Sequence, residues 1–304
     1  MKAVAMGVHV LDVLVRPVEE IPEGQGGALV EQIRLTAAGC AGGTALVLAK
    51  LGAQVTSAGA IGTDAAGDLL LALLRRDGVD PSGLVRRDDV QTSASVLPIR
   101  ANGERPAFHV VGANGTYGPD DVDWPAVEAA DVLHLGGPEF LGGEVARGIL
   151  DRARAAGATT SADVLAPGDP GLLEWIAPAF GALDYLLPNE EQVLGFTGER
   201  DLEAGCRALI ARGVGCVVAT RGAEGALIVG EKTVPVPVFP VEVVDTTGCG
   251  DAFSAGFLRG LGLGLDREAA ARLGCATASL VAGGLGTDHG AFDLATVQAL
   301  AATQ

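Results

Sequence analysis

The stretch VVDTTGCGDAFSAGF, residues 243–257, changes from a strand into a helix through a glycine turn. Two β-branched residues end an apolar run, Gly248 and Gly250 free the backbone, and apolar residues return at helical spacing at Phe253 and Phe257. The first N–H groups of a helix have no partner inside it and lie at the positive end of its dipole. A turn without bulky side chains therefore presents several aligned donors to a bound anion.

Asp251 stands at the start of this helix, beside any anion that the turn holds. Two interpretations are open. In one, Asp251 accepts a proton from a substrate hydroxyl while the N–H groups of the turn stabilise charge on a transferring phosphoryl group. In the other, Asp251 only caps the helix, because Asp is among the residues preferred at a helix N-terminus.

The composition suits a well-buried globular protein. The chain has 304 residues, of which 48% are hydrophobic and 19% are charged. Its formal net charge of -17 argues against nucleic-acid binding through a basic face and against adsorption to an anionic membrane. Any phosphate that this protein handles must therefore be held by backbone N–H groups, a few Arg side chains and a metal ion.

The cysteines and the N-terminus indicate the compartment. The five cysteines form no CxxC pair and have no His at ligand spacing, which argues against a zinc site and a disulfide framework. The first apolar run is interrupted by Asp12 and lacks a cleavage pattern, so we expect a strand there instead of a signal peptide. No window approaches the roughly 18 apolar residues of a membrane span. We expect a protein of the reducing cytoplasm.

Strands and helices alternate along most of the chain, which is the βαβ pattern of a mostly parallel sheet covered on both faces. No linker is long enough to separate two independent domains, so we expect one domain over residues 1–304. The strands are expected at residues 2–10, 54–61, 131–135, 158–163, 183–187, 215–220, 225–230 and 233–239. The helices are expected within 37–52 and at 65–77, 142–156, 201–212, 251–261, 266–282 and 293–302.

Two segments break this alternation. Pro and Gly interrupt residues 16–36, and residues 92–100 and 106–111 flank an Asn-Gly turn that is typical of a β-hairpin. We expect these segments to build a small separate sheet. Asp12 precedes them at the end of the first predicted strand, where ligands gather in open α/β sheets, although a surface-loop Asp is the alternative.

Several nucleotide-dependent and hydrolytic classes are excluded or weakened. None of the three lysines ends a glycine loop, so the P-loop pattern GxxxxGK[ST] is absent. No GxGxxG follows a strand, and GxSxG is absent, which weakens the dinucleotide-binding and hydrolase interpretations.

The motif DTTGCGD, residues 245–251, resembles the signature of the ribokinase-like, or PfkB-type, carbohydrate kinases, with Cys249 where Ala is usual. The resemblance spans nearly the whole chain. It implies a three-layer α/β/α fold with a mostly parallel central sheet and a small β-sheet lid at about 12–36 and 91–112. It also implies that Asp251 is the catalytic base. The backbone N–H groups of Gly248, Cys249 and Gly250 would form the anion hole, and Asp245 and Thr246 would shape the phosphate and cation surroundings.

Other segments match the family in order. Residues 7–12 resemble the first strand, whose terminal Asp binds sugar hydroxyls, and Gly112-Ala113-Asn114 is similar to the stretch that closes the lid hairpin. The resemblance assigns substrate contacts to Asp12, Gly39, Gly42, Gly43 and Thr44, and we expect His109 on the lid to approach the ligand. It assigns nucleotide contacts to Asn189, Thr220, Gly222, Gly225, Thr246, Gly248 and Gly250.

Besides Cys249, the chain departs from the family pattern at four positions. Cys40 replaces the second Gly of the first glycine motif, and Thr44 replaces a sugar-binding Asn. Gly136 stands where ribokinases carry a sugar-contacting Glu, which makes ribose itself a poor candidate. Gln192 replaces a Glu that helps to place the Mg²⁺ shell, so Glu190 or Glu191 would have to compensate, or the dependence on metal is weaker.

The resemblance implies an ATP-dependent kinase that phosphorylates a hydroxyl of a small carbohydrate and uses Mg²⁺. It assigns Glu191 and Gln192 to the magnesium shell through water, and Asp245 to a monovalent cation, K⁺, whose requirement is left open. Two alternatives also stay open: a nucleoside kinase of the same fold, and a sugar- or nucleoside-binding regulator without catalysis. Exposed strand edges on the lid favour a homodimer that pairs through it.

Overall fold

The computed structural model describes residues 1–303 and contains two β-sheets. The main sheet has nine strands, whose bounds are β1 (Lys2–Gly7), β4 (Gln54–Gly62), β5 (Asp80–Arg87), β8 (Val132–Gly136), β9 (Thr159–Asp163), β10 (Tyr185–Leu186), β11 (Cys216–Thr220), β12 (Ala226–Val229) and β13 (Thr233–Val236). Their order is β13-β12-β11-β10-β9-β8-β1-β4-β5. Neighbouring strands from β11 to β5 are parallel, and β12 and β13 are antiparallel additions at one edge.

Helices cover both faces of this sheet. They are α1 (Cys40–Lys50), α2 (Ala65–Arg76), α3 (Trp124–Glu128), α4 (Gly143–Ala155), α5 (Pro170–Ile176), α6 (Glu190–Thr197), α7 (Leu202–Ala211), α8 (Cys249–Gly262), α9 (Arg267–Ala282) and α10 (Leu294–Ala301). In β1, Ala3 and Ala5 belong to the core on the α1, α8 and α9 side, whereas Val4 and Met6 belong to the core on the α4 and α7 side. This alternation buries both faces of the strand and confirms the predicted three-layer α/β/α class.

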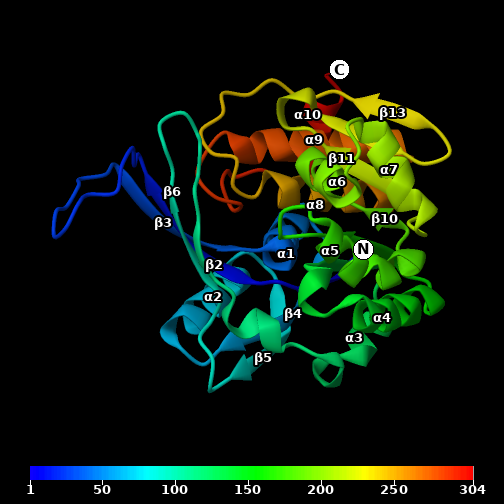
Figure 1. Cartoon of the computed structure of the whole chain (residues 1–304), viewed down its shortest axis with the longest axis horizontal. Coiled ribbons are helices and arrows are strands. Elements are labelled where there is room, and N and C mark those ends of the chain that lie inside the picture. The colour runs from blue at the N-terminus through cyan, green and yellow to red at the C-terminus, as the bar shows by residue number, and fades with distance from the viewer. Residues whose placement is uncertain (304) are drawn as a thin grey trace.

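A second sheet of four strands forms the lid beside the main sheet. Its strands are β2 (Val10–Arg16), β3 (Gln32–Ala38), β6 (Ala94–Pro98) and β7 (Phe108–Val110), in the order β3-β2-β6-β7. Figure 1 shows β2, β3 and β6 projecting to one side of the molecule, away from the helical layers. The predicted hairpin and the predicted small separate sheet are both confirmed.

The first predicted strand was too long. The chain bends at Gly7, whose φ is 121°, and β2 begins in the other sheet at Val10. Asp12 therefore lies in the middle of a lid strand, not at the end of a central strand. The bend is possible because Gly7 has no Cβ; an added Cβ would lie 2.0 Å from the carbonyl oxygen of Gly136.

Among residues 1–303, no helix combines the length and apolar character that crossing a membrane requires.

Candidate active site

A cavity of about 350 Å³ lies where the lid meets the carboxyl ends of the central strands and the first turns of α1 and α8. Segments far apart in the sequence meet here, as the carboxyl-end rule for parallel sheets predicts. Of the residues expected at the site, those that line this cavity are Asp12, Gly39, Asn189, Gln192, Thr220, Gly222, Thr246, Gly248, Gly250 and Asp251. Its wall also includes Cys40, Arg105, Asp163 and Thr287.

Asp251 is the third residue of α8 and does not cap it. The N-cap is Gly248, with φ 77°, and among residues 1–303 no side chain caps this helix. The helix-cap alternative for Asp251 is therefore wrong. Burial, followed by the charges of Asp163 and Asp12, raises the pKa of the Asp251 carboxyl well above its usual range.

The turn before α8 presents unpaired N–H groups. The amides of Gly248, Gly250 and Asp251 have no acceptor within the described chain, whereas the Cys249 amide donates to the Thr246 carbonyl oxygen at 3.3 Å. Gly248 also has no room for a side chain, because an added Cβ would lie 2.1 Å from the Thr287 hydroxyl oxygen. Of the three amides expected in the anion hole, those of the two glycines are thus free to bind an anion.

Helix α1 packs directly against Asp251. A Cβ on Gly43 would lie 2.1 Å from Oδ2 of Asp251, so glycine at this position leaves the space that the carboxyl occupies. Thr44 is fully buried, and its hydroxyl lies 3.5 Å from the Asp251 carbonyl oxygen. Thr44 therefore lies behind the cavity wall and supports the start of α8, where sequence reasoning expected a substrate contact.

Three other glycines that were expected at the site stand where neighbouring groups pack too closely for a Cβ. Gly39 is the N-cap of α1 with φ 88°, and a Cβ there would lie 2.6 Å from the Val8 carbonyl oxygen. A Cβ on Gly42 would approach the buried ring of His9 at 3.1 Å. Gly136 ends β8, where a Cβ would lie 2.3 Å from the Ala41 nitrogen, so no glutamate fits at this position.

Asp12 reaches the cavity from the lid. It is 6% exposed, and in the lid sheet it stands opposite Thr36 of β3 and Ser95 of β6. Burial raises the pKa of Asp12 to about 6, opposed by Ser95 and Arg105. His109 lies on the exposed edge strand and shares a hydrogen bond of 3.0 Å with the Ser95 hydroxyl. It stands beyond Ser95 and does not line the cavity.

Asp163 is a site residue that sequence reasoning missed. It ends β9, it is 7% exposed, and burial raises the pKa of its carboxyl to about 7. Potential ligand atoms of Cys40, Asp163 and Asp251 lie within 4.8 Å of one another. The sequence did contain a signal for Asp163, because this residue ends the central strand predicted at 158–163. No motif, however, distinguished it from other acidic residues.

Arg105 is the second residue that sequence reasoning missed. It belongs to the loop between β6 and β7, and its Nε donates to the Thr246 hydroxyl at 3.3 Å. Among the residues that the structure describes, it is the one Lys or Arg that lines this cavity. The lid therefore brings a positive charge to the turn before α8.

A second cavity, of about 310 Å³, adjoins the first on the far side of the turn. Its wall is mostly apolar and comes from the end of β11 and from α8 and α9. It includes the expected residues Thr220, Gly222, Gly225, Thr246, Cys249 and Gly250. Burial raises the pKa of the Cys249 thiol to about 12, so the thiolate that would make it reactive is disfavoured.

Residues expected near cations are mostly engaged with protein atoms. The Gln192 amide donates to the carbonyl oxygens of Val164 and Ala166, at 2.7 and 3.0 Å, and its own oxygen accepts from the Asn189 amide. Glu191 is exposed in the first turn of α6 and lines neither cavity. The Asp245 carboxylate is fully buried and accepts from the amides of Thr247 and Gly286, at 2.9 and 3.1 Å.

The sequence and fold match a known family. Residues 3–292 match the family described as pfkB family carbohydrate kinase. A nucleoside kinase of Methanothermobacter thermautotrophicus is 27% identical over 290 residues, which cover 93% of this chain and 90% of that protein. An ATP-dependent ribose-1-phosphate kinase of Halopiger xanaduensis is 31% identical over 291 residues, with coverages of 96% and 94%.

The fold is also that of solved ribokinase structures. A putative ribokinase II from E. coli, in complex with ATP and Mg²⁺, superposes with a TM-score of 0.86 at 21% identity, covering 100% of this chain and 99% of that one. The nine-stranded, mostly parallel sheet and the four-stranded lid agree with the ribokinase-like expectation. The chain therefore belongs to the pfkB family of carbohydrate kinases and is a phosphotransferase with an alcohol group as acceptor.

Proposed function

We propose that this protein transfers the γ-phosphoryl group of ATP to a hydroxyl group of an uncharged sugar, with Asp251 as the general base. The observation that carries the proposal is the Asp251 carboxyl, which lies in the cavity beside free N–H groups and caps no helix. A largely buried carboxylate without a structural partner is costly to the fold, so its presence favours a chemical role.

The proposed reaction needs alignment, one base and charge stabilisation. Asp12 and Asp163 would accept hydrogen bonds from acceptor hydroxyls, and Asp251 would take the proton of the attacking hydroxyl. A bond forms between that oxygen and the γ-phosphorus, and the bond from the γ-phosphorus to the β–γ bridging oxygen breaks, so that ADP leaves. The amides of Gly248 and Gly250 and the Arg105 guanidinium would stabilise the transferring group.

The apolar cavity suits the base of ATP, because it opens onto the turn that would hold the phosphates. Thr220, Gly222 and Gly225 would bound the nucleotide, and Asn189 would lie near its phosphates. Mg²⁺ prefers oxygen ligands and keeps several waters. Glu190 and Glu191, in the first turn of α6 next to Asn189, offer such oxygens for contact through water. When bound there, Mg²⁺ would neutralise phosphate charge.

The acceptor side of the cavity favours an uncharged, hydroxyl-rich molecule. Asp12, Asp163 and Asp251 all line it. Among the described residues of its wall, Arg105 is the one basic side chain that offsets their negative charge. A phosphate already on the acceptor would be repelled by these carboxylates. A nucleoside acceptor is the second candidate, since the nucleoside kinase of M. thermautotrophicus matches 93% of this chain.

Three further assignments accompany the proposal. The face of the lid opposite Asp12 exposes Leu35, Val96 and Phe108, which stand in one row across β3, β6 and β7 and would be covered in a homodimer. All five cysteines are unpaired, which suits a cytoplasmic enzyme. The requirement for K⁺, expected around Asp245, stays a prediction.

A panel of acceptors tests the proposal. ADP release with ATP and Mg²⁺ should be measured with ribose, deoxyribose, cytidine and ribose 1-phosphate. We expect turnover with at least one uncharged acceptor, and a kcat/KM at least about tenfold lower for ribose 1-phosphate because of charge repulsion. Preference for ribose 1-phosphate would contradict the uncharged acceptor, and preference for cytidine would favour the nucleoside kinase. No ADP above the acceptor-free background would contradict both candidates.

A further inference from the structure

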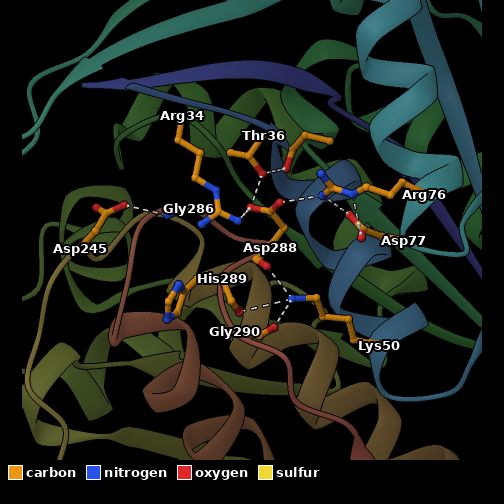
Figure 2. A network of polar contacts seen from close by, with 11 residues as sticks. Arg34, Thr36, Lys50, Arg76, Asp77, Asp245, Gly286, Asp288, His289 and Gly290 are labelled. Atoms are coloured by element: carbon orange, nitrogen blue, oxygen red, sulfur yellow. Dashed lines mark hydrogen bonds and ion pairs between the residues drawn. The ribbon is translucent and has the colours of Figure 1, made fainter. Parts of the chain in front are cut away.

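Asp288 is a buried carboxylate outside the cavity that receives three side-chain donors. It is 7% exposed. Its Oδ1 accepts from the Thr36 hydroxyl at 2.8 Å and pairs with Arg34 at 3.0 Å, and its Oδ2 accepts from Arg76 at 2.8 Å (Figure 2). Arg34 and Thr36 come from the lid strand β3, whereas Arg76 ends α2. One carboxylate thus joins the base of the lid to the helical body.

Lys50 holds the backbone of the same loop. Its ammonium group, at the end of α1, donates to the carbonyl oxygens of Asp288, His289 and Gly290 at 2.7, 3.3 and 2.9 Å (Figure 2). The loop is therefore fixed from two sides, through the Asp288 side chain and through three successive carbonyls. Charge-assisted hydrogen bonds of this kind are stronger than neutral ones and leave the loop little freedom.

The loop comprises residues 286–290. Its other end contacts residues 245–251, the turn before α8 that would bind the phosphates and is called here the anion-binding turn. The Gly286 amide donates to Asp245 Oδ2 at 3.1 Å (Figure 2). Asp245 Oδ1 in turn accepts from the Thr247 amide and hydroxyl. Thr287, directly before Asp288, lies against Gly248 and fills the space that a Cβ there would need. The placement of residues 286–288 thereby sets the placement of the turn.

The lid end of the network touches the acceptor site. Thr36, which donates to Asp288, stands directly opposite Asp12 in the lid sheet. A displacement of β3 relative to the loop would therefore move Asp12 relative to the N–H groups of Gly248 and Gly250. Asp288 lies at the point where these two halves of the site are joined.

We propose that Asp288 is a positioning residue that keeps the lid strand carrying the acceptor contact in register with the anion-binding turn. Asp288 does not line the cavity and acts through Thr36 and Arg34 on one side and through Thr287 and Gly286 on the other. The inference rests on the proposed function, because it assumes that Asp12 and the turn hold the two reactants.

The test compares Asp288→Asn with Asp68→Asn in full-length protein. Asp68 is an exposed residue of α2 that pairs with Arg86, so its variant controls for the loss of an Asp–Arg pair. For each protein, kcat, both KM values, the thermal midpoint, and the amounts of ADP and phosphorylated product are measured with ATP and the best acceptor of the panel above. ADP is also measured without acceptor.

For Asp288→Asn we expect kcat to fall at least about tenfold, because misplaced donors stabilise the transferring group less well. The KM for ATP should stay within about threefold, since no residue of the loop at 286–290 and none of its partners Arg34, Thr36, Lys50 and Arg76 lines the apolar nucleotide cavity. ADP should exceed phosphorylated product, because a loosened lid admits water to the site. Asp68→Asn should match the wild type in every measurement.

A second pair of variants keeps the inference testable if Asp288→Asn folds poorly. Thr36→Val removes one hydroxyl donor at nearly constant shape, and Arg34→Met removes the lid cation. Each should raise the ratio of ADP to product, and their effects on kcat should be non-additive when combined.

A lowered thermal midpoint with unchanged kcat and equal ADP and product would show a purely structural role and overturn the inference. If the wild type releases no ADP with any acceptor, the proposed function fails and this inference fails with it.

Discussion

Asp251 and its neighbours concentrate unfavourable charge in one place. Asp12, Asp163 and Asp251 share a cavity wall, and burial raises the pKa of each carboxyl. Folding alone would favour fewer acids here, because buried carboxylates without cations destabilise the native state. The arrangement is understandable when the acids bind hydroxyl groups and accept a proton.

Replacing Asp251 should therefore separate activity from stability. For Asp251→Asn we expect kcat to fall by about 10² to 10⁴, the usual contribution of a general base. We expect the thermal midpoint to rise or stay unchanged, because a buried charge is removed without loss of a cap. Steady-state ADP release and calorimetry on the same preparation measure both effects. Near-normal turnover would remove Asp251 from the role of base.

Asp163→Asn should move the pH profile of the enzyme. The charge of Asp163 raises the pKa of Asp251, so its removal lowers that pKa. A base works only when deprotonated, and activity increases with pH through its pKa. The acid limb of kcat/KM against pH should thus move to lower pH in Asp163→Asn. Glu199→Gln, an exposed acid-to-amide change just beyond α6 and outside both cavities, is the control and should leave the limb in place.

Motif residues were predictable from the sequence, and their isolated neighbours were not. The order of small residues around Asp251 marks a turn that presents N–H groups, and the structure has that turn. Asp163 and Arg105 belong to no local pattern, because their relevance arises only when β9 and the lid loop meet the turn in space. Thr44 shows the opposite error, since a residue inside a glycine motif need not face the cavity.

Helices α1 and α8 approach each other closely at Asp251. Gly43→Ala should disturb this contact, because the new Cβ would lie 2.1 Å from the Asp251 carboxyl. We expect kcat to fall at least about tenfold through displacement of the base. Gly148→Ala in α4 is a matched control, because a Cβ there meets nothing within 4 Å and alanine favours a helix. Equal kcat in the two variants would contradict the proposed contact.

The helices and strands that could be predicted from the sequence are those with a clear periodicity of apolar residues or with clear turn residues at their ends. The long helices α4, α7, α8 and α9 and the strands of the parallel sheet other than β5 were located within a few residues. The short helices α3, α5 and α6 were missed, because one or two turns leave too few residues to show a period. The break between β1 and β2 was missed because apolar residues continue through it, and only the approach of Gly136 to Gly7 reveals the bend.

The balance of buried acids and buried histidines sets how the molecule responds to pH. Burial raises the pKa of Asp12 to about 6 and that of Asp163 to about 7, so protonation favours the folded state and stability is lost as pH rises toward 7. Burial lowers the pKa of His9 and His134 to about 4, so stability is lost as pH falls from 6.5 toward that value.

The two effects oppose each other up to about pH 7, because histidines in the unfolded state are still half-protonated at pH 6.5. Burial also raises the pKa of the Asp251 carboxyl well above its usual range, so stability continues to be lost at higher pH. We therefore expect the thermal midpoint of the ligand-free protein to be higher at pH 6.5 than at pH 8 and to change little between pH 6.5 and 5. Calorimetry at constant ionic strength measures this, and Asp163→Asn should reduce the difference between pH 6.5 and 8. A higher midpoint at pH 8 would contradict this account.

The order of strands in the main sheet has a consequence for the way the protein is made. From β8 to β13 each new strand pairs with the one made before it, so the sheet can extend at one edge while the ribosome still holds the chain. The turn at 245–251 and the loop at 286–290 come after β13, the last of these strands. A nascent chain can thus complete this sheet before it possesses Asp251 or the turn that precedes it, and phosphoryl transfer becomes possible only near the end of synthesis.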